Sequence, residues 1–233
     1  MNFAVTYSRA QQSIHAPLVT VEAHISPGLP LFSIVGLPET GIKESRDRVR
    51  SAIITSNFEF PYRRITINLG PADLPKEGAR FDLATALAIL SATQQIPPLS
   101  EDYEFIGDLA LSGEIRGVSG ILSAAMAAKK AKKTLIIPEQ NAKEASLVQG
   151  LRFYSAKHLL QVCAHFKKET LLTLHPTSTI TEDLNTYPDI QDVKGQASAK
   201  RALLIAAAGG HNLLMSGPPG TGKTMLASRL PGI

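Results

Sequence analysis

Apolar and polar residues alternate along several short segments near the start of the chain. Leu18–Ile25 reads Leu-Val-Thr-Val-Glu-Ala-His-Ile, and Leu31–Val35 follows it after the turn at Pro27-Gly28. A third segment, Arg64–Leu69, shows the same alternation. Alternation of this kind with β-branched residues is typical of strands that bury one face. We therefore predict three strands in this part of the chain.

Two segments near these strands have the apolar spacing of a helix instead. In Glu39–Ser56 the apolar side chains share one face, and most of the charged ones lie elsewhere. Asp82 is a suitable capping residue for a second helix that runs through Leu83 to Leu90. The order of strands and helices predicts an α/β (α+β) fold.

The same pattern continues as far as Lys167. A tight turn is predicted at Ser112-Gly113-Glu114, before Ile115. The other predicted elements are strands at Phe105–Leu111, Thr134–Pro138 and Arg152–Tyr154 and helices at Ile121–Ala131, Ala142–Val148 and Lys157–Lys167.

The composition changes between Lys168 and Asp189, where Thr, Ser, Pro and Asn dominate. Such a stretch is typical of a linker. We predict a first domain at 1–168, a linker at 169–189 and the start of a second domain at 190–233. Within the second domain we expect a helix over Gln196–Ala208, a strand at Asn212–Met215 and a helix from Lys223 to about Leu230.

The composition is that of an ordinary globular protein, with 44% hydrophobic residues, a net charge of +4 and a pI of about 9.2. The N-terminus has no signal-peptide pattern, and we expect no membrane span because there is no run of 18 apolar residues. The single cysteine, Cys163, lies on the apolar face of a predicted helix, so we expect a buried, inert thiol. These features favour a cytoplasmic protein.

The clearest chemical signal is the segment Gly217–Thr224, which matches the pattern G-x-x-x-x-G-K-[ST] of a P-loop. Glycines let the backbone turn its N–H groups towards phosphate oxygens, and the following helix adds its positive end. Lys223 is expected at the β- and γ-phosphates and the Thr224 hydroxyl at Mg²⁺. The predicted ligands are therefore ATP and Mg²⁺. The predicted phosphate-binding residues are Gly217, Pro218, Pro219, Gly220, Thr221, Gly222, Lys223 and Thr224.

Several motifs resemble one family of ATPases. Gly-Pro-Pro-Gly-Thr-Gly-Lys-Thr is similar to the Walker A of AAA+ ATPases, and the segments Asp192–Gln196 and His211–Gly217 are similar to its magnesium-chelatase branch. Upstream, Val35–Pro38, Glu44–Arg50 and Leu69–Gly78 resemble the ComM-type (YifB-type) magnesium-chelatase-like ATPases. The resemblance implies a homo-oligomeric (hexameric) AAA+ motor that acts on DNA in natural transformation, with a helicase or branch-migration role.

The family pattern places a Walker B acidic pair, a sensor residue and an arginine finger downstream of the P-loop, whereas this sequence ends at Ile233. On this resemblance, we expect the chain to bind ATP weakly. We expect ATP hydrolysis to need residues beyond Ile233.

The first domain also resembles the Lon protease domain, whose motif runs Pro-Lys-Asp-Gly-Pro-Ser-Ala-Gly. The corresponding segment here begins Pro75-Lys76-Glu77-Gly78 and places Arg80 at the nucleophile and Ile121 near the lysine of the catalytic pair. A guanidinium stays protonated and cannot attack a carbonyl. We therefore predict a Lon-like fold without peptidase activity. A displaced pair, Ser91 or Ser123 with Lys129, is the alternative.

Other polar residues carry weaker signals. The six histidines are scattered without a ligand pattern, which argues against a zinc site, and Asp73 and Glu77 are expected to hold a loop. Two cationic groups, Lys43–Arg50 and Lys129–Lys133, are candidates for DNA phosphates. Internal pairing or a solvated face is the competing interpretation of both.

Three other functions remain open at this point. The chain could be a non-catalytic Lon-like binding or assembly module, a Lon-type peptidase, or a protein similar to magnesium-chelatase subunit I. The Lon-like first half argues against the last of these.

Overall fold

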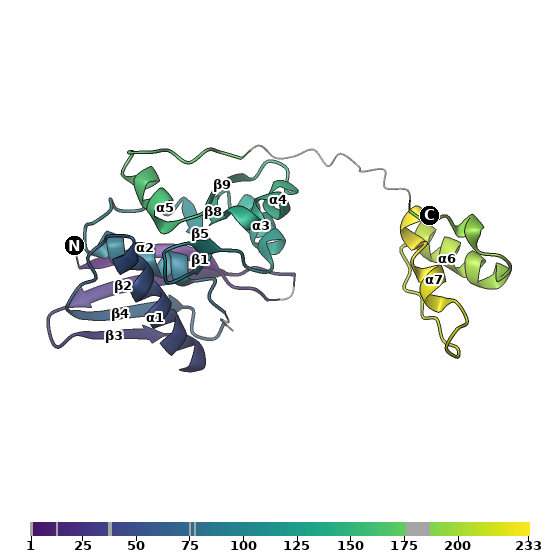
Figure 1. The fold of residues 1–233 in the computed structure, drawn as a ribbon, viewed down its shortest axis with the longest axis horizontal. Coiled ribbons are helices and arrows are strands. Elements are labelled where there is room, and N and C mark those ends of the chain that lie inside the picture. Colours follow the sequence, from purple (N-terminus) through teal and green to yellow (C-terminus); the bar gives the residue numbers. More distant parts are fainter. Residues whose placement is uncertain (1, 13, 37–38, 75, 77, 176–186) are drawn as a thin grey trace. The chain divides into compact units, whose positions relative to one another are not determined.

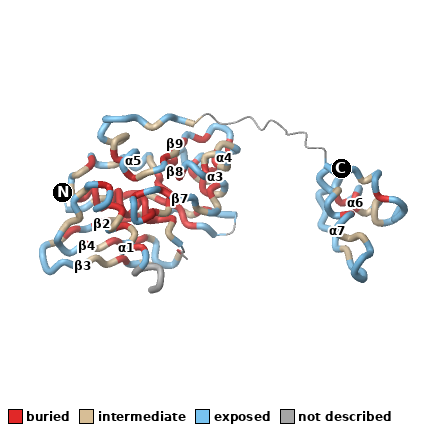
Figure 2. Tube along the Cα trace, in the orientation of Figure 1, coloured by how far each residue is buried: buried red, intermediate tan, exposed pale blue. Residues whose placement is uncertain are grey.

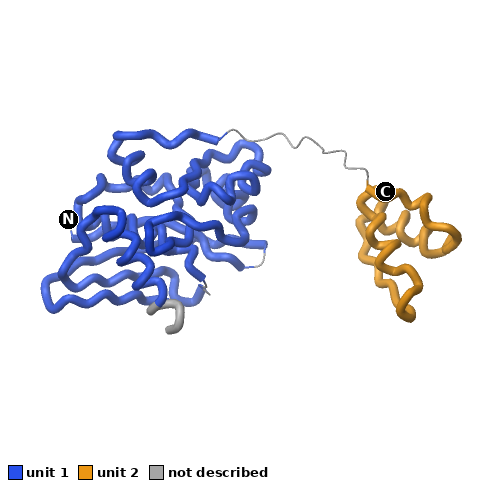
Figure 3. The backbone as a smooth tube through the Cα atoms, in the orientation of Figure 1, with its two compact units in different colours: residues 1–180 blue, residues 181–233 orange. Residues whose placement is uncertain are grey.

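The computed structural model describes residues 2–12, 14–36, 39–74, 76, 78–175 and 187–233, with the backbone alone for residues 39–43. The chain divides into two compact units, Met1–Ile180 and Thr181–Ile233, called unit 1 and unit 2 (Figure 3). The domain limits at 168 and 190 inferred from composition stay predictions.

Unit 1 begins with a four-stranded sheet in the order β1-β2-β4-β3 (Figure 1). Its strands are β1 (Phe3–Arg9), β2 (Leu18–Ser26), β3 (Leu31–Val35) and β4 (Arg64–Gly70). β2 pairs antiparallel with β1 and β4, while β3 and β4 are parallel. Burial alternates along β2 and β4, as the sequence pattern predicted.

Two helices pack on this sheet. α1 (Glu39–Thr55) connects the parallel strands β3 and β4, which require a long crossover. α2 (Asp82–Ala92) is buried along all 11 of its residues and packs against β1, β2 and α1. It has no polar face because it is a core helix enclosed on every side.

The second half of unit 1 contains a parallel sheet in the order β5-β8-β9. These strands are β5 (Tyr103–Phe105), β8 (Thr134–Pro138) and β9 (Arg152–Ala156). The remaining elements of this half are β6 (Asp108–Leu109), β7 (Ile115–Arg116), α3 (Ile121–Lys130), η1 (Glu139–Asn141), α4 (Ala142–Ser146) and α5 (Leu159–Phe166). β6 and β7 form a two-stranded hairpin around the predicted turn at residues 112–114, where Gly113 has a φ of 91°.

A buried ion pair links the four-stranded sheet of unit 1 to the parallel sheet β5-β8-β9. The Arg9 guanidinium at the end of β1 contacts the Glu104 carboxylate of β5 through two N–O distances of 2.6 Å. Arg9 also donates to the Ala16 carbonyl at 2.8 Å. Because both charged groups are buried, each depends on the other to compensate the loss of water.

Unit 2 is small and mostly helical. It contains η2 (Ile190–Asp192), α6 (Ala197–Gly209), α7 (Lys223–Ala227) and η3 (Leu230–Gly232). Its hydrophobic core consists of the buried side chains of Val193, Leu203 and Leu226.

In unit 1 the structure differs from the sequence analysis at three points. β1 was not predicted, and the strand predicted over Phe105–Leu111 is divided into β5 and β6. Asp82 does not cap α2: the N-cap is Phe81, and the Asp82 carboxylate instead accepts from Ser45 and Arg48. These partners lie in α1, so tertiary contacts determine the role of this carboxylate.

Candidate functional site

The P-loop segment lies between α6 and α7 in unit 2. Gly220 and Gly222 have φ values of 83° and 82°, a region that L-residues with a side chain rarely adopt. α7 begins at Lys223, directly after Gly222. The glycines of the motif therefore form a tight turn that leads into a helix, as the sequence predicted.

Lys223 folds back across the loop. Its Nζ donates to the carbonyls of Gly217 and Pro218, both at 2.8 Å. The Thr221 hydroxyl donates to the Pro218 carbonyl at 2.9 Å. The ammonium group is thus held inside the curve of the loop, at the position where a phosphate-binding lysine is required.

Gln196 holds the loop from the side of α6. This residue adopts a left-handed conformation, with a φ of 53°, just before α6 begins, and its Nε2 donates to the Thr221 carbonyl at 3.1 Å. A Cβ atom at Gly222 would lie 3.3 Å from the same nitrogen. Glycine at this position lets Gln196 approach the backbone closely.

The loop offers donors that have no partner within the described residues. No backbone N–H from Gly220 to Thr224 donates a hydrogen bond there, and the Thr224 hydroxyl is exposed and makes none. A row of free N–H groups beside an ammonium and a hydroxyl is the donor set that phosphate and Mg²⁺ require. The residues present therefore fit a magnesium–nucleotide ligand.

The strand predicted at Asn212–Met215, before the loop, is not formed. The described part of unit 2 contains no strand with which it could pair, and a strand without a partner leaves its hydrogen-bonding groups unsatisfied. Leu214 in this segment is 92% exposed. The loop is therefore supported by α6, α7 and a small core.

The position equated with the protease nucleophile is occupied by a buried arginine. Arg80 is 5% exposed, and its Nη1 donates to Gln11 Oε1 at 3.2 Å. Lys76 is also buried and donates to the carbonyls of Pro71 and Leu74. Asp73 is exposed, and Glu77 lies outside the described residues. No acyl nucleophile occupies this position.

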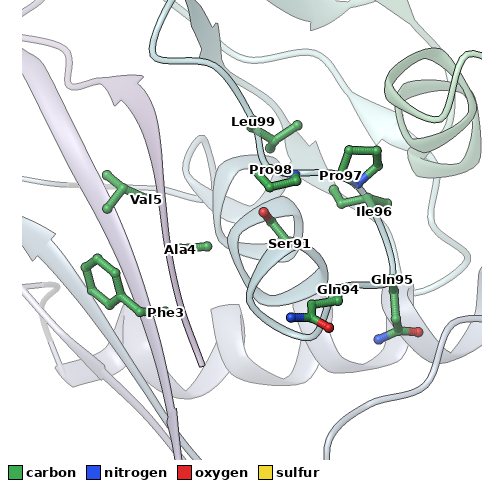
Figure 4. A pocket seen from close by; sticks show the side chains of 10 residues that line it. All are labelled: Phe3, Ala4, Val5, Ser91, Gln94, Gln95, Ile96, Pro97, Pro98 and Leu99. Atoms are coloured by element: carbon green, nitrogen blue, oxygen red, sulfur yellow. The ribbon is translucent and has the colours of Figure 1, made fainter. Parts of the chain in front are cut away.

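The alternative serine–lysine pairs are not assembled either. Ser91 borders a mainly apolar hollow between β1 and the end of α2 (Figure 4), and none of the described residues that line it is titratable. Ser123 and Lys129 both lie on α3, six positions apart, which corresponds to about 9 Å along the helix. Among the described residues that line the hollow at Ser91, none is a lysine. Neither proposed serine–lysine pair is therefore brought together within the described part of the chain.

Cys163 is buried in α5, and burial raises the pKa of its thiol to about 12. The thiol is therefore protonated near neutral pH and is a poor nucleophile. The prediction of a buried cysteine is confirmed, and its inertness stays a prediction.

The two cationic groups differ in how many of their charges are engaged. In α1, Arg46 donates to the Phe32 carbonyl, Arg48 pairs with Asp82, and Arg50 lies over the Phe60 ring. These three arginines therefore have partners within the fold, which favours the internal-pairing interpretation of this group. The Lys43 side chain lies outside the described residues. At the end of α3, by contrast, Lys129 and Lys130 are exposed, and among the described residues neither forms an ion pair.

Two polar arrangements were missed in the sequence. Asp82 accepts from Ser45 Oγ at 2.7 Å and from Arg48 Nε at 2.6 Å, and Arg48 Nε also lies 3.5 Å from Asp108. Burial raises the pKa of Asp82 to about 6, although the hydrogen bonds from Arg48 and Ser45 oppose this change. No sequence signal connects these residues, because they lie on different elements.

The second missed arrangement is a serine–histidine pair. Ser155 Oγ lies 2.6 Å from His175 Nε2, and the His175 ring stacks on Phe153. Glu139 borders the same hollow but pairs with Lys157 at 3.1 Å. Among the described residues no carboxylate contacts the imidazole, so within that part of the chain the pair lacks the third member of a catalytic triad.

No helix in the described part of the chain is long and apolar enough to cross a membrane.

Comparisons with known proteins identify two matching family models. Residues 21–141 match the model of subunit ChlI of Mg-chelatase, and residues 189–233 match the model of magnesium chelatase, subunit ChlI. The second match contains the whole P-loop segment.

Similar proteins are found among curated relatives. The chain is 51% identical to the competence protein ComM of Haemophilus influenzae, over 100% of this chain and 47% of that protein. It is 50% identical to the uncharacterized protein YifB of Escherichia coli, over 100% of this chain and 46% of that protein. A Lon protease of Rhizobium meliloti is 30% identical over 67% of this chain and 21% of the protease. The chain thus spans about half the length of the first two relatives.

Proposed function

The chain belongs to the ComM- and YifB-type magnesium-chelatase-like family, and from this premise we propose that unit 2 binds the phosphates of Mg·ATP as part of an AAA+ ATPase. The observation that carries the proposal is the loop at Gly217–Thr224, with its free backbone N–H groups around the Lys223 ammonium. The proposed location is the cytoplasm.

Each part of the loop has a proposed role. The N–H groups from Gly220 to Thr224 would bind phosphate oxygens, and Lys223 would exchange its bonds to the Gly217 and Pro218 carbonyls for the β- and γ-phosphates. The Thr224 hydroxyl would be a ligand of Mg²⁺, which neutralises phosphate charge when it is bound. Gln196 would keep the loop open at Thr221.

Binding by this chain is expected to be weak. Three buried side chains form the core beneath the loop, and phosphate binding must fix the backbone around it. Hydrolysis also requires an acidic Mg²⁺ ligand, a group that orients water and an arginine at the transition state. We propose that the family supplies these groups in a hexameric assembly.

Calorimetry with Mg·ATP tests the nucleotide site. Lys223→Ala should remove the binding heat, because the loop loses its only ammonium group, whereas Lys143→Ala in unit 1 should preserve it. Thr224→Ala should lower the affinity for ATP in Mg²⁺ but not in EDTA. Equal binding by wild type and Lys223→Ala would contradict the proposal.

We further propose that unit 1 contributes weak, sequence-independent contacts with DNA. The support is the exposed pair Lys129 and Lys130 at the end of α3, together with Lys132, which forms no ion pair within the described residues. The α1 arginines are engaged in the fold and make a poorer contact surface. Salt should weaken such binding steeply if several phosphates are contacted.

Fluorescence anisotropy with a labelled duplex tests the DNA contacts. Replacing Lys129, Lys130 and Lys132 with Ala should weaken binding and flatten its salt dependence. The matched control replaces three exposed lysines elsewhere, Lys143, Lys157 and Lys194. Equal losses in the two triple variants would show that net charge alone is responsible.

A second candidate function is a non-catalytic binding or assembly module in unit 1. It is favoured by Arg80, which occupies the position of the protease nucleophile while the surrounding unit remains well packed. A serine-reactive fluorophosphonate should leave the chain unlabelled. A stoichiometric serine adduct would instead show a working hydrolase.

A further inference from the structure

The Arg80 side chain is fixed in position from one end. Its Nη1 donates to Gln11 Oε1 at 3.2 Å, and Ser119 Oγ donates to the same oxygen at 3.1 Å. The exposed Gln11 side chain also lies close to Gly120, where a Cβ atom would be 2.6 Å from it. One end of the guanidinium is therefore bonded to a glutamine that Ser119 also engages.

The other edge of the same guanidinium has no partner. Arg80 Nε and Nη2 are buried and form no hydrogen bond, and Arg80 forms no ion pair within the described residues. Burial lowers the pKa of Arg80, but an arginine remains charged in proteins. A buried, unpaired charged donor is rare and costly, so this arrangement requires an explanation.

Nε and Nη2 form the edge of arginine that donates two parallel hydrogen bonds. This geometry matches the two oxygens of a carboxylate or a phosphate. Both nitrogens are covered, so a ligand would reach them through a side-chain rearrangement at the surface, as is common on binding. Arg80 Nε and Nη2 are thus two adjacent donors for which the described residues provide no acceptor.

Arg80 borders a cavity of about 640 Å³ with a mostly polar lining. Ala79, Asp108 and the turn Gly117–Ser119 form the rest of its wall, together with Gln11 and Gly78. Asp108 is the only carboxylate among the described lining residues, and it lies 3.5 Å from Arg48. Arg48 is shared between Asp108 and the closer Asp82, at 2.6 Å, whereas Arg80 forms no ion pair with any carboxylate of the described residues.

We propose that this cavity is a binding site for a small oxyanion, a carboxylate or phosphate group that accepts two hydrogen bonds from Nε and Nη2 of Arg80. The site lies in unit 1 and is independent of the P-loop in unit 2. Its size suits a small molecule or a single acidic group.

Nuclear magnetic resonance of arginine Nε–H groups tests the proposal directly. The protein should carry Lys223→Ala, so that phosphate cannot use the P-loop. Inorganic phosphate and succinate are titrated separately, and the Arg80 signal is identified by its absence in Arg80→Met. We expect a saturable shift of this signal with at least one of the two anions.

Three variants separate the site from general charge effects. Arg80→Met should weaken anion binding at least tenfold, and the exposed Arg152→Met, which removes the same charge from the surface of β9, should leave it unchanged. Ser119→Trp should block the cavity while every charge is kept. If Arg80→Met fails to fold, Ser119→Trp tests the proposal, which requires that anion binding is lost when the cavity is blocked.

The outcomes are distinct. A response to phosphate alone, or to succinate alone, identifies the ligand class. No saturable shift with either anion, or equal binding in Arg80→Met and wild type, would overturn the proposal. An equal loss in Arg152→Met would also overturn it, because binding would then follow net charge. Failure of Mg·ATP binding at the P-loop leaves this test unaffected.

Discussion

The two units of the molecule differ in the size of their hydrophobic cores and in the functional motifs that they carry. In unit 1 the buried positions form two extensive hydrophobic clusters, whereas unit 2 has a core of three buried side chains (Figure 2). The motif with the clearest chemistry lies in unit 2, on a loop whose N–H groups are free. Unit 1 has the larger hydrophobic core. The position that aligns with the Lon protease nucleophile lies in unit 1 and is occupied by the buried Arg80.

This difference shows that the segment with a binding motif and the segments that stabilise the fold can lie in different regions of one chain. A phosphate loop needs backbone donors and one lysine, which a short segment can provide. A core needs buried area contributed by many elements. Substitutions should therefore affect the stability of unit 1 and the proposed nucleotide binding of unit 2 separately.

The largest expected effect comes from the buried ion pair of unit 1. Arg9→Met leaves the Glu104 carboxylate buried without a partner and should lower the free energy of unfolding by about 3–5 kcal/mol. Adding Glu104→Leu should restore much of that loss. Urea unfolding followed by circular dichroism measures both values. A double variant no more stable than Arg9→Met would show that the pair has little coupling.

A pair of leucine truncations compares a buried position of unit 1 with an exposed position of unit 2. Leu87 is 0% exposed in α2, so Leu87→Ala should cost about 2–5 kcal/mol through lost contacts and a cavity. The control is Leu214→Ala in unit 2, where the side chain is 92% exposed, and it should change stability by less than about 0.5 kcal/mol. Similar losses of stability in the two variants would contradict the expectation that the cost follows burial of the side chain.

Stability should also depend on pH through Asp82. Its folded pKa of about 6 exceeds the ordinary value of 3.8, so the folded state binds the proton more tightly than the unfolded state. Unit 1 should therefore lose stability as pH rises between these two values and stay level above about pH 6. From pH 4.5 to 7.5 we expect the wild type to lose roughly 1–2 kcal/mol relative to Asp82→Asn. Parallel pH profiles for the two proteins would contradict this.

The smallest effect is expected at the P-loop. Gln196→Ala removes one exposed hydrogen bond, to the Thr221 carbonyl, and should destabilise unit 2 by about 0.5–1 kcal/mol. Hydrogen exchange of the Leu226 amide, which donates to the Gly222 carbonyl, reports on this locally. Gln191→Ala, in the exposed turn η2, is the control. Faster exchange in unit 1 as well would show that the units are coupled.

Local patterns identified most elements and the P-loop, because both are encoded in consecutive residues. Long-range features were not accessible in this way. Asp82 meets Ser45 across 37 positions, Arg80 meets Gln11 across 69, and Arg9 meets Glu104 across 95. The predicted strand at Asn212–Met215 had the right composition, but composition does not provide a neighbouring strand.

The complete burial of α2 determines how unit 1 must fold. Its residues Asp82–Ala92 have no polar face, so the isolated segment cannot persist as an amphipathic helix in water. The Thr6 hydroxyl of β1 donates to the Ala84 carbonyl of α2 at 2.9 Å, and the helix packs against α1, β1, β2 and β5. We therefore expect it to form only when segments distant in the sequence close around it, so that its formation is coupled to long-range contacts of unit 1.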